Sequence, residues 1–366
     1  MQKLNWRRIV LKVGSALIAP DQDGCRSRYL LTIAQFIVRC RARGIEVILV
    51  SSGSVAAGSH LFPSDIPRSV VMKKAMAAAG QTEMMAMWDR FFDFPSAQLL
   101  LTHGDLRDRE RYESIRETIF TLLEHGVLPI INENDAVTTD DLKVGDNDNL
   151  SALVAILANA DKLLLLTDQQ GLFTSDPRTD INATLIDEVT HINDELRQLA
   201  GGSGTNLGTG GMATKLQAAD IARRAGVEVI IAKGADENVI LKCMSEQLPG
   251  TRFLKLTAPK DGRKKWLLAG PKSSGQILID AGAVHALQSK GASLLAKGIT
   301  RAIGEFERGD LINLIDVNQQ IIARGLTRFS HLEIDKIKGA HSNQISHLLD
   351  YDSGVEVLHR DDMVVL

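Results

Sequence analysis

The chain has 366 residues, a formal net charge of −3, and 44% hydrophobic and 24% charged residues. This length and composition are typical of two or three globular domains with a sizeable core, which needs neither disulfides nor a structural metal. The small negative charge excludes a chain that binds nucleic acid through an overall positive charge.

Short apolar runs alternate with helical patterns over the first two-thirds of the chain. In chain order, the sequence predicts a strand at 8–13, a helix at 27–43, a strand at 45–50, a helix at 69–92, a strand at 96–101, a helix at 109–125, a strand at 127–131, a helix at 149–159, a strand at 161–166, a helix at 211–225 and a strand at 227–232. Such alternation indicates βαβ units, and hence an α/β fold with a mainly parallel sheet buried on both faces.

The composition changes after about residue 250. From about 273 the helical periodicity fades, and short alternating segments at 276–280, 311–315 and 321–323 are separated by glycine turns. This pattern predicts a second domain of mostly short strands, with a small barrel as one candidate architecture. We therefore expect a first domain at 1–257, a linker at 258–272 and a second domain at 273–366.

Three cysteines, Cys25, Cys40 and Cys243, lie far apart in the sequence. Their number and spacing fit neither a disulfide framework nor a zinc site, so they are interpreted as reduced thiols. The N-terminus lacks the apolar stretch of a signal peptide, and no run of about 18 apolar residues predicts a membrane span. A cytoplasmic location is expected.

Polar or glycine-containing segments follow four of the predicted strands, at 12–14, 51–53, 132–135 and 167–168. In parallel sheets, ligands bind at the carboxyl ends of the strands. The sequence therefore predicts a ligand site at that edge of the sheet.

Phosphate binding is not carried by a familiar motif, because no Walker P-loop and no protein-kinase signature is present. The run G-T-G-G-M-A at 208–213 formally fits a dinucleotide fingerprint, but a polar loop rather than a strand precedes it, which argues against that interpretation. The glycine-rich run 201–215, which leads into a helix and ends at Lys215, favours a phosphate site. A mobile linker is the alternative for this run alone, and a solvated strand end is the alternative for Lys12.

Two further segments leave alternatives open. Ser51 or Ser52 could cap the following helix, whose start could also hold a substrate anion. The run 132–149 is dense in Asp and Asn and is either a turn-rich loop or an amino-acid site, in which Asp135 would hold an α-ammonium group and Asn147 would donate to a carboxylate.

Six segments together resemble the amino-acid kinase family, in the order and spacing typical of it. They are K-V-G-S at 12–15, V-S-S-G-S-V-A-A-G at 50–58, I-N-E-N-D-A-V at 131–137, K-V-G-D-N-D-N-L-S-A at 143–152, L-L-L-L-T-D-Q-Q-G-L at 163–172 and G-T-G-G-M-A-T-K-L-Q-A-A at 208–219. The third and fourth are typical of the bacterial members that phosphorylate glutamate. The runs at 291–299 and 306–310 are similar to the PUA domain that many of those members carry.

The resemblance implies a three-layer αβα sandwich followed by a small, mostly-β PUA pseudo-barrel. It implies ATP-dependent phosphorylation of the L-glutamate side-chain carboxylate to L-glutamyl 5-phosphate, the first step of proline biosynthesis, with Mg²⁺ as a cofactor. It further implies a homo-oligomer (dimer or tetramer), feedback inhibition by proline, and channelling of the product to glutamyl phosphate reductase. The rivals are a kinase of the same fold with another small acceptor, and RNA binding by the PUA domain, for which few aromatic residues (4%) are available.

The resemblance also assigns residues. The expected catalytic residues are Lys12 and Lys215, on the transferring phosphoryl group, and Asp148, which would hold the lysines. Ser52, Asp135 and Asn147 are expected to bind glutamate. The expected ATP contacts are Lys12, Thr167, Asp168, Thr209, Gly210, Gly211, Met212, Ala213, Thr214 and Lys215.

Overall fold

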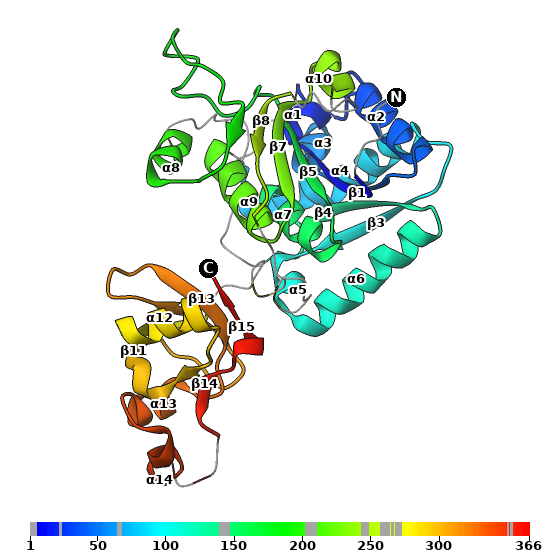
Figure 1. The fold of residues 1–366 in the computed structure, drawn as a ribbon. Coiled ribbons are helices and arrows are strands. Elements are labelled where there is room, and N and C mark those ends of the chain that lie inside the picture. Colours follow the sequence, from blue (N-terminus) through cyan, green and yellow to red (C-terminus); the bar gives the residue numbers. More distant parts are fainter. Residues whose placement is uncertain are drawn as a thin grey trace. The chain divides into compact units, whose positions relative to one another are not determined.

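The computed structural model describes residues 6–21, 24–63, 68–138, 147–201, 211–242, 249–256, 264, 267, 273–349, 351 and 354–366. The chain divides into two compact units, Met1–Ala258 and Pro259–Leu366 (Figure 1). Of the expected linker 258–272, only Lys264 and Leu267 lie among the described residues. In the described part of the chain, no helix combines the length and apolar character needed to cross a membrane.

An eight-stranded sheet forms the centre of the first unit (Figure 1). Its strands are β1 Arg8–Val13, β2 Glu46–Ser51, β3 Ser96–Leu101, β4 Leu128–Glu133, β5 Lys162–Thr167, β6 Glu188–Val189, β7 Glu228–Lys233 and β8 Thr251–Phe253. They lie in the order β3-β4-β2-β1-β5-β7-β8-β6, and every neighbouring pair is parallel except β7 and β8. The predicted mainly parallel sheet is confirmed, and each predicted strand agrees with the structure to within two residues.

Helices cover both faces of this sheet (Figure 1). They are α1 Ser15–Ile18, α2 Leu30–Ala42, α3 Ser54–Gly58, α4 Val70–Asp89, α5 His103–Arg107, α6 Arg109–Glu124, α7 Asn147–Leu157, α8 Asp194–Gly201, α9 Met212–Arg224 and α10 Glu237–Lys242. The five long helices that the sequence predicts are present to within three residues at each end. The shorter ones were not predicted, since four to eight residues are too few to establish a periodicity.

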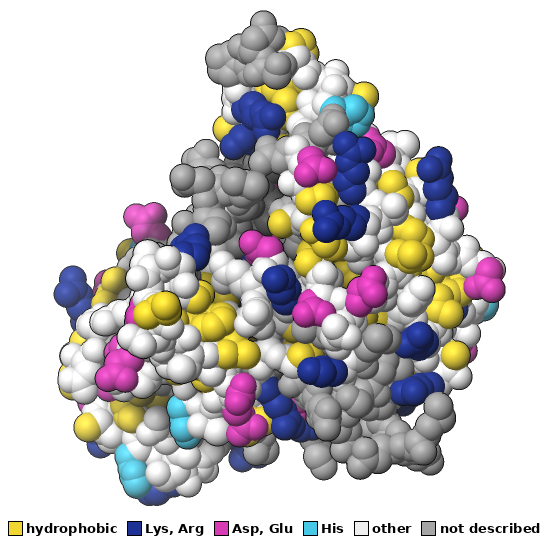
Figure 2. Space-filling view, turned by 90° about the horizontal axis from the view of Figure 1, so that it is seen from above, with side chains coloured by type: hydrophobic (Ala, Val, Ile, Leu, Met, Phe, Trp, Pro, Cys, Tyr) yellow, Lys and Arg dark blue, Asp and Glu magenta, His cyan; other side chains and the backbone are white. Residues whose placement is uncertain are grey.

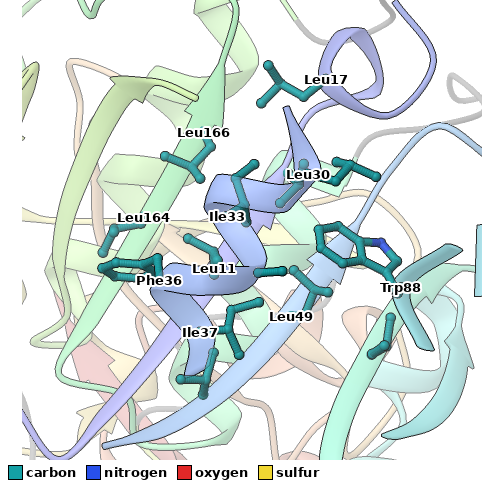
Figure 3. Close-up of a cluster of buried hydrophobic side chains, with 14 of the residues drawn as sticks. Leu11, Leu17, Leu30, Ile33, Phe36, Ile37, Leu49, Trp88, Leu164 and Leu166 are labelled. Atoms are coloured by element: carbon teal, nitrogen blue, oxygen red, sulfur yellow. The ribbon is translucent and has the colours of Figure 1, made fainter. Parts of the chain in front are cut away.

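The packing of β1 shows which of its side chains face the core and which face α7 and α9. Leu11 of β1 packs with Leu49 and Leu164 of its neighbours against Ile33 of α2 and Trp88 of α4 (Figure 3). Because side chains alternate along a strand, the residue after Leu11 faces the opposite side, where α7 contacts β1 and α9. Strands buried on both faces read as continuous apolar runs, so a lysine within such a run stands out.

The second unit contains a five-stranded sheet, β11-β9-β12-β13-β15, and a two-stranded sheet, β10-β14. Its strands are β9 Gly275–Ile279, β10 Leu294–Leu295, β11 Ile299–Ile303, β12 Leu311–Ile315, β13 Ile321–Leu326, β14 Glu356–Leu358 and β15 Met363–Val365. Its helices are α12 Ala281–Lys290, α13 His331–Ile337 and α14 Ile345–Leu349. A mostly-β unit is confirmed.

The expectation that helical structure fades after about 273 is wrong for α12. This helix buries only Leu287, so its sequence carries almost no apolar period. Its ends explain it better: the Asp280 side chain accepts from the Ala283 N–H at 2.7 Å, and Gly291 takes a left-handed conformation at the C-terminal end.

Basic and acidic side chains are interspersed on the face of the molecule that Figure 2 shows. A mixture of this kind fits the small net charge of the sequence. It provides no field of a single sign on the described part of that face.

Candidate active site

The carboxyl ends of β1, β2 and β5 are joined directly by backbone hydrogen bonds. The Ser52 N–H donates to the Val13 carbonyl, and the Gly14 N–H donates to the Leu166 carbonyl, both at 3.0 Å. β4 lies on the other side of β2, so its end reaches the same edge. The structure therefore brings together the four polar strand ends that the sequence singles out.

Two lysines share one carboxylate at this edge. Lys12 Nζ lies 2.6 Å from Asp148 Oδ1, and Lys215 Nζ lies 3.2 Å from Asp148 Oδ2. Thr214 Oγ1 also donates to Asp148 Oδ2, at 2.8 Å. The side chains of both lysines are 7% exposed and that of Asp148 is 1% exposed. Two buried cations around one anion leave a local excess of one positive charge.

The three charged residues come from three elements. Lys12 lies in β1 on the side that faces α7, Asp148 lies in the first turn of α7, and Lys215 lies in the first turn of α9. An anion in the first turn of α7 also interacts favourably with the positive end of the helix dipole. Residues nearly 140 positions apart thus meet because helix starts and strand ends share one edge of the sheet.

Opposing effects act on Asp148. Burial by itself would raise the pKa of its carboxyl group, but the two ammonium groups, with hydrogen bonds from Lys12 and Thr214, hold that pKa far below its ordinary value. Asp148 is therefore a permanent anion near neutral pH. It cannot accept a proton in catalysis, and its chemical use is to orient the two cations.

The expected ATP contacts fall into two groups. Thr167 ends β5 and is buried, and its Oγ1 donates to Oδ1 of the exposed Asp168 at 2.9 Å. Gly211 precedes α9 without a side-chain cap, Met212 is buried in the first turn and Ala213 is exposed. Thr209 and Gly210 lie outside the described residues, so the structure describes only part of this expected set.

A second set of polar side chains surrounds Asp135, which follows β4 and is 4% exposed. Ser54 Oγ, at the start of α3, donates to Asp135 Oδ2 at 3.0 Å. Ser52 is 5% exposed, and its Oγ has no hydrogen-bond partner within the described ranges. Ser54 was not among the expected site residues, although it belongs to the same S-S-G-S run.

Three amide side chains are linked around the end of β4. The backbone N–H of Glu133 donates to Asn132 Oδ1 at 2.9 Å and to Asn147 Oδ1 at 3.2 Å. Asn132 Nδ2 then donates to Oε1 of Gln81, on α4, at 2.7 Å. All three amide side chains are buried. The sequence reading missed Gln81, because a glutamine in an Ala- and Met-rich helix is an ordinary helix former.

The suggestion that Ser51 or Ser52 caps α3 is wrong. The residue before α3 is Gly53, whose φ of 102° is in the left-handed region, and no side chain caps the helix. Ser51 Oγ instead accepts from Trp88 Nε1 at 2.9 Å and donates to Met84 Sδ at 3.2 Å. Ser51 therefore anchors the strand end to α4, and Ser52 is the hydroxyl left for a ligand.

The carboxylates give no metal centre of their own. Among the described residues, no group of three or more His, Cys, Asp or Glu side chains is placed to hold a metal ion. Asp148 is occupied by its two lysines.

Comparison with known proteins agrees with the fold. Residues 7–233 match the model of the amino acid kinase family, and residues 275–349 match that of the PUA domain. The chain belongs to the amino acid kinase family, and so uses ATP.

The relatives are more specific than the family. The chain is 66% identical to Glutamate 5-kinase 2 of Pseudoalteromonas translucida over 361 residues, 98% of both chains. It is 50% identical to Glutamate 5-kinase of Vibrio vulnificus over 364 residues, 98% of this chain and 96% of that one. A solved structure of UMP kinase from Bacillus anthracis is similar over 69% of this chain and 97% of that chain, with 18% identity and a TM-score of 0.48; a likeness at that level says nothing of the substrate.

Proposed function

We propose that this chain transfers the γ-phosphoryl group of ATP to the side-chain carboxylate of L-glutamate. The products would be L-glutamyl 5-phosphate and ADP, in the first step of proline biosynthesis. The observation that carries the proposal is the buried Lys12–Asp148–Lys215 cluster at the ligand edge, together with the buried Asp135 that accepts from Ser54. The names of relatives that match almost the whole chain support the same acceptor.

The proposed phosphoryl transfer to a carboxylate needs no general base. A glutamate side chain has an ordinary pKa near 4.3, so the attacking carboxylate is already ionised at neutral pH. The difficulty is that an anion must approach the polyanionic phosphates. Two lysines held by Asp148 supply fixed positive charge where negative charge develops, and fixed charge needs no reorganisation during the reaction.

The nucleotide would lie on the α9 side of the cluster. The uncapped N-terminus of α9 at Gly211 offers backbone N–H groups to a phosphate, and Thr214 and Lys215 follow in its first turn. Thr167 and Asp168, at the end of β5, would contact the same nucleotide. Mg²⁺ would arrive with ATP and screen its phosphates.

The amino acid would lie on the α3 side. Asp135 would hold the α-ammonium group, and Ser52 and Asn147 would donate to the carboxylates. The orientation of Asn147 supports this, because its Oδ1 faces the Glu133 N–H and its amide nitrogen is left as a donor.

We also propose a wider context for this activity. The resemblance alone supports a homo-oligomer, feedback inhibition by proline and channelling to glutamyl phosphate reductase. A cytoplasmic location is supported by ATP use and by the reduced state of two buried cysteines, Cys25 and Cys40. Domain limits of 1–257 and 273–366 with a linker at 258–272 are supported by the division at Ala258 and by the two family matches.

The test is ATP turnover with a panel of acceptors. ADP release should be robust with L-glutamate, weak with L-aspartate, N-acetylglutamate and UMP, and reduced when proline is added. Hydroxylamine should trap the acyl phosphate as a hydroxamate only when glutamate and ATP are both present. Robust turnover with another member of the panel, and none with glutamate, would contradict the assignment.

A further inference from the structure

We propose that Gln81 binds the α-carboxylate of the amino-acid substrate through its side-chain N–H groups, and so selects acceptors with a free α-carboxylate. The inference rests on the proposed function and names a further substrate-binding residue for it. Gln81 lies in α4, outside every segment that the family resemblance singles out.

Gln81 carries a buried hydrogen-bond donor that no described residue uses. Gln81 is 8% exposed, and its Nε2 has no hydrogen-bond partner in the part of the chain that the structure describes. Buried amide donors almost always have a partner, because leaving one unmade costs free energy. A ligand that supplies an acceptor would remove that cost.

Neighbouring hydrogen bonds set the orientation of the Gln81 side-chain amide. The Glu133 N–H donates to Asn132 Oδ1 at 2.9 Å, and because two donors would repel at that distance, the Asn132 nitrogen points the other way. That nitrogen donates to Gln81 Oε1 at 2.7 Å. The chain of hydrogen bonds thus fixes which end of Gln81 is the oxygen, and both N–H groups of Nε2 are left for a ligand.

The close packing of α4 against α3 places Gln81 beside the candidate amino-acid site. A Cβ atom added at Gly80 would lie 2.0 Å from the Ser54 carbonyl oxygen and 2.3 Å from the Gly58 nitrogen, so α4 and α3 are in backbone contact at this point. The residue after Gly80 is therefore held beside the S-S-G-S turn. Ser54 donates to Asp135 there, and Ser52 carries a buried hydroxyl that has no partner within the described residues.

Donors at these positions suit the α-carboxylate of an amino-acid substrate. In an α-amino acid, the ammonium and the α-carboxylate are bonded to the same carbon. If Asp135 takes the ammonium, neutral donors beside it face the α-carboxylate, whose two oxygens accept several hydrogen bonds. Gln81 and Ser52 supply such donors without a charge that would compete with Lys12 for the side-chain carboxylate.

The experiment compares Gln81→Glu and Gln81→Met with the wild type and with Gln35→Met, an exposed glutamine on α2. Gln81→Glu keeps the acceptor for Asn132 and the shape, whereas Gln81→Met adds no buried charge, and circular dichroism establishes that each variant is folded before its kinetics are compared. Each protein is assayed with L-glutamate and with its α-carboxamide, in which an uncharged amide replaces the α-carboxylate.

We expect both Gln81 variants to raise KM for L-glutamate by about 10- to 100-fold, while KM for ATP stays within about twofold. Gln81→Glu should also reverse much of the preference for glutamate over its α-carboxamide, because a carboxylate repels an anion and accepts from an amide. Gln35→Met should match the wild type.

The outcomes separate two failures. A wild type that does not phosphorylate glutamate contradicts the proposed function. A wild type that does, together with a Gln81→Glu variant whose KM for glutamate and acceptor preference are unchanged, overturns the role of Gln81 alone. Equal losses of kcat with both acceptors at unchanged KM would show a structural role and would also overturn it.

Discussion

The site has two regions that are stabilised in different ways. In the charged region, Lys12 and Lys215 are each hydrogen-bonded to Asp148. In the neutral region, Ser52 Oγ and Gln81 Nε2 are buried without a partner within the described ranges. Buried charges must be paired, because an unpaired ion loses far more solvation free energy than an unpaired amide. The protein therefore pairs its own buried charges, whereas the substrate can supply the partners of the neutral donors.

The largest expected effect comes from removing either cation. Lys12→Ala or Lys215→Ala should lower kcat for glutamate by about 100- to 1,000-fold, as removal of a single preorganised charge-stabilising donor does elsewhere. The fold should persist, because Asp148 keeps the other lysine as its partner. Steady-state kinetics and circular dichroism measure the two effects. The control is Lys297→Ala, an exposed lysine of the second unit; near-normal turnover in both active-site variants would contradict the role of the cluster.

Removal of the anion should act on stability as well as on rate. Asp148→Asn leaves two buried ammonium groups facing each other, and should lower the free energy of unfolding by about 3–5 kcal/mol. Urea unfolding at pH 7 measures the change. The matched control is Asp335→Asn, which breaks an exposed pair with Lys338 and should cost at most about 1 kcal/mol. Equal effects in the two variants would show that the Asp148 cluster does not depend on its buried charge.

The same residue predicts a dependence on pH. The lysines hold the pKa of Asp148, which burial alone would raise, well below its ordinary value. The resulting stability is fully present above the ordinary Asp pKa of about 3.9, and is lost as the pH falls through the lower pKa of the folded state. The stability gap between the wild type and Asp148→Asn should therefore be constant from about pH 5 to 8 and narrow below about pH 4. A gap that widens in acid would have the wrong sign.

The two regions also differ in how well sequence predicts them. Lys12 lies near the end of an apolar strand and Lys215 follows a glycine-rich run, so their chemistry is indicated by the residues around them, whereas the role of Asp148 comes from the family resemblance. Gln81 has no such signal: its meaning comes from a hydrogen bond to Asn132, 51 positions away, and from the close approach of α3 and α4 at Gly80. Long strands and helices are predicted by their periods, whereas capped, weakly amphipathic helices such as α12 are not.

The smallest expected effect lies at the link between the neutral region and Asp135. Ser54→Ala removes the hydrogen bond from Ser54 Oγ to Asp135 Oδ2. One such bond should change KM for glutamate by about 2- to 10-fold and leave KM for ATP unchanged, since the substrate ammonium still pairs with the carboxylate. Ser59→Ala is the control, because the Ser59 hydroxyl donates to the Ala56 carbonyl. A loss of kcat/KM for glutamate in Ser54→Ala as large as the loss in Lys12→Ala would mean that Asp135 needs the same prior organisation as the charged cluster. That result would remove the distinction between the two regions.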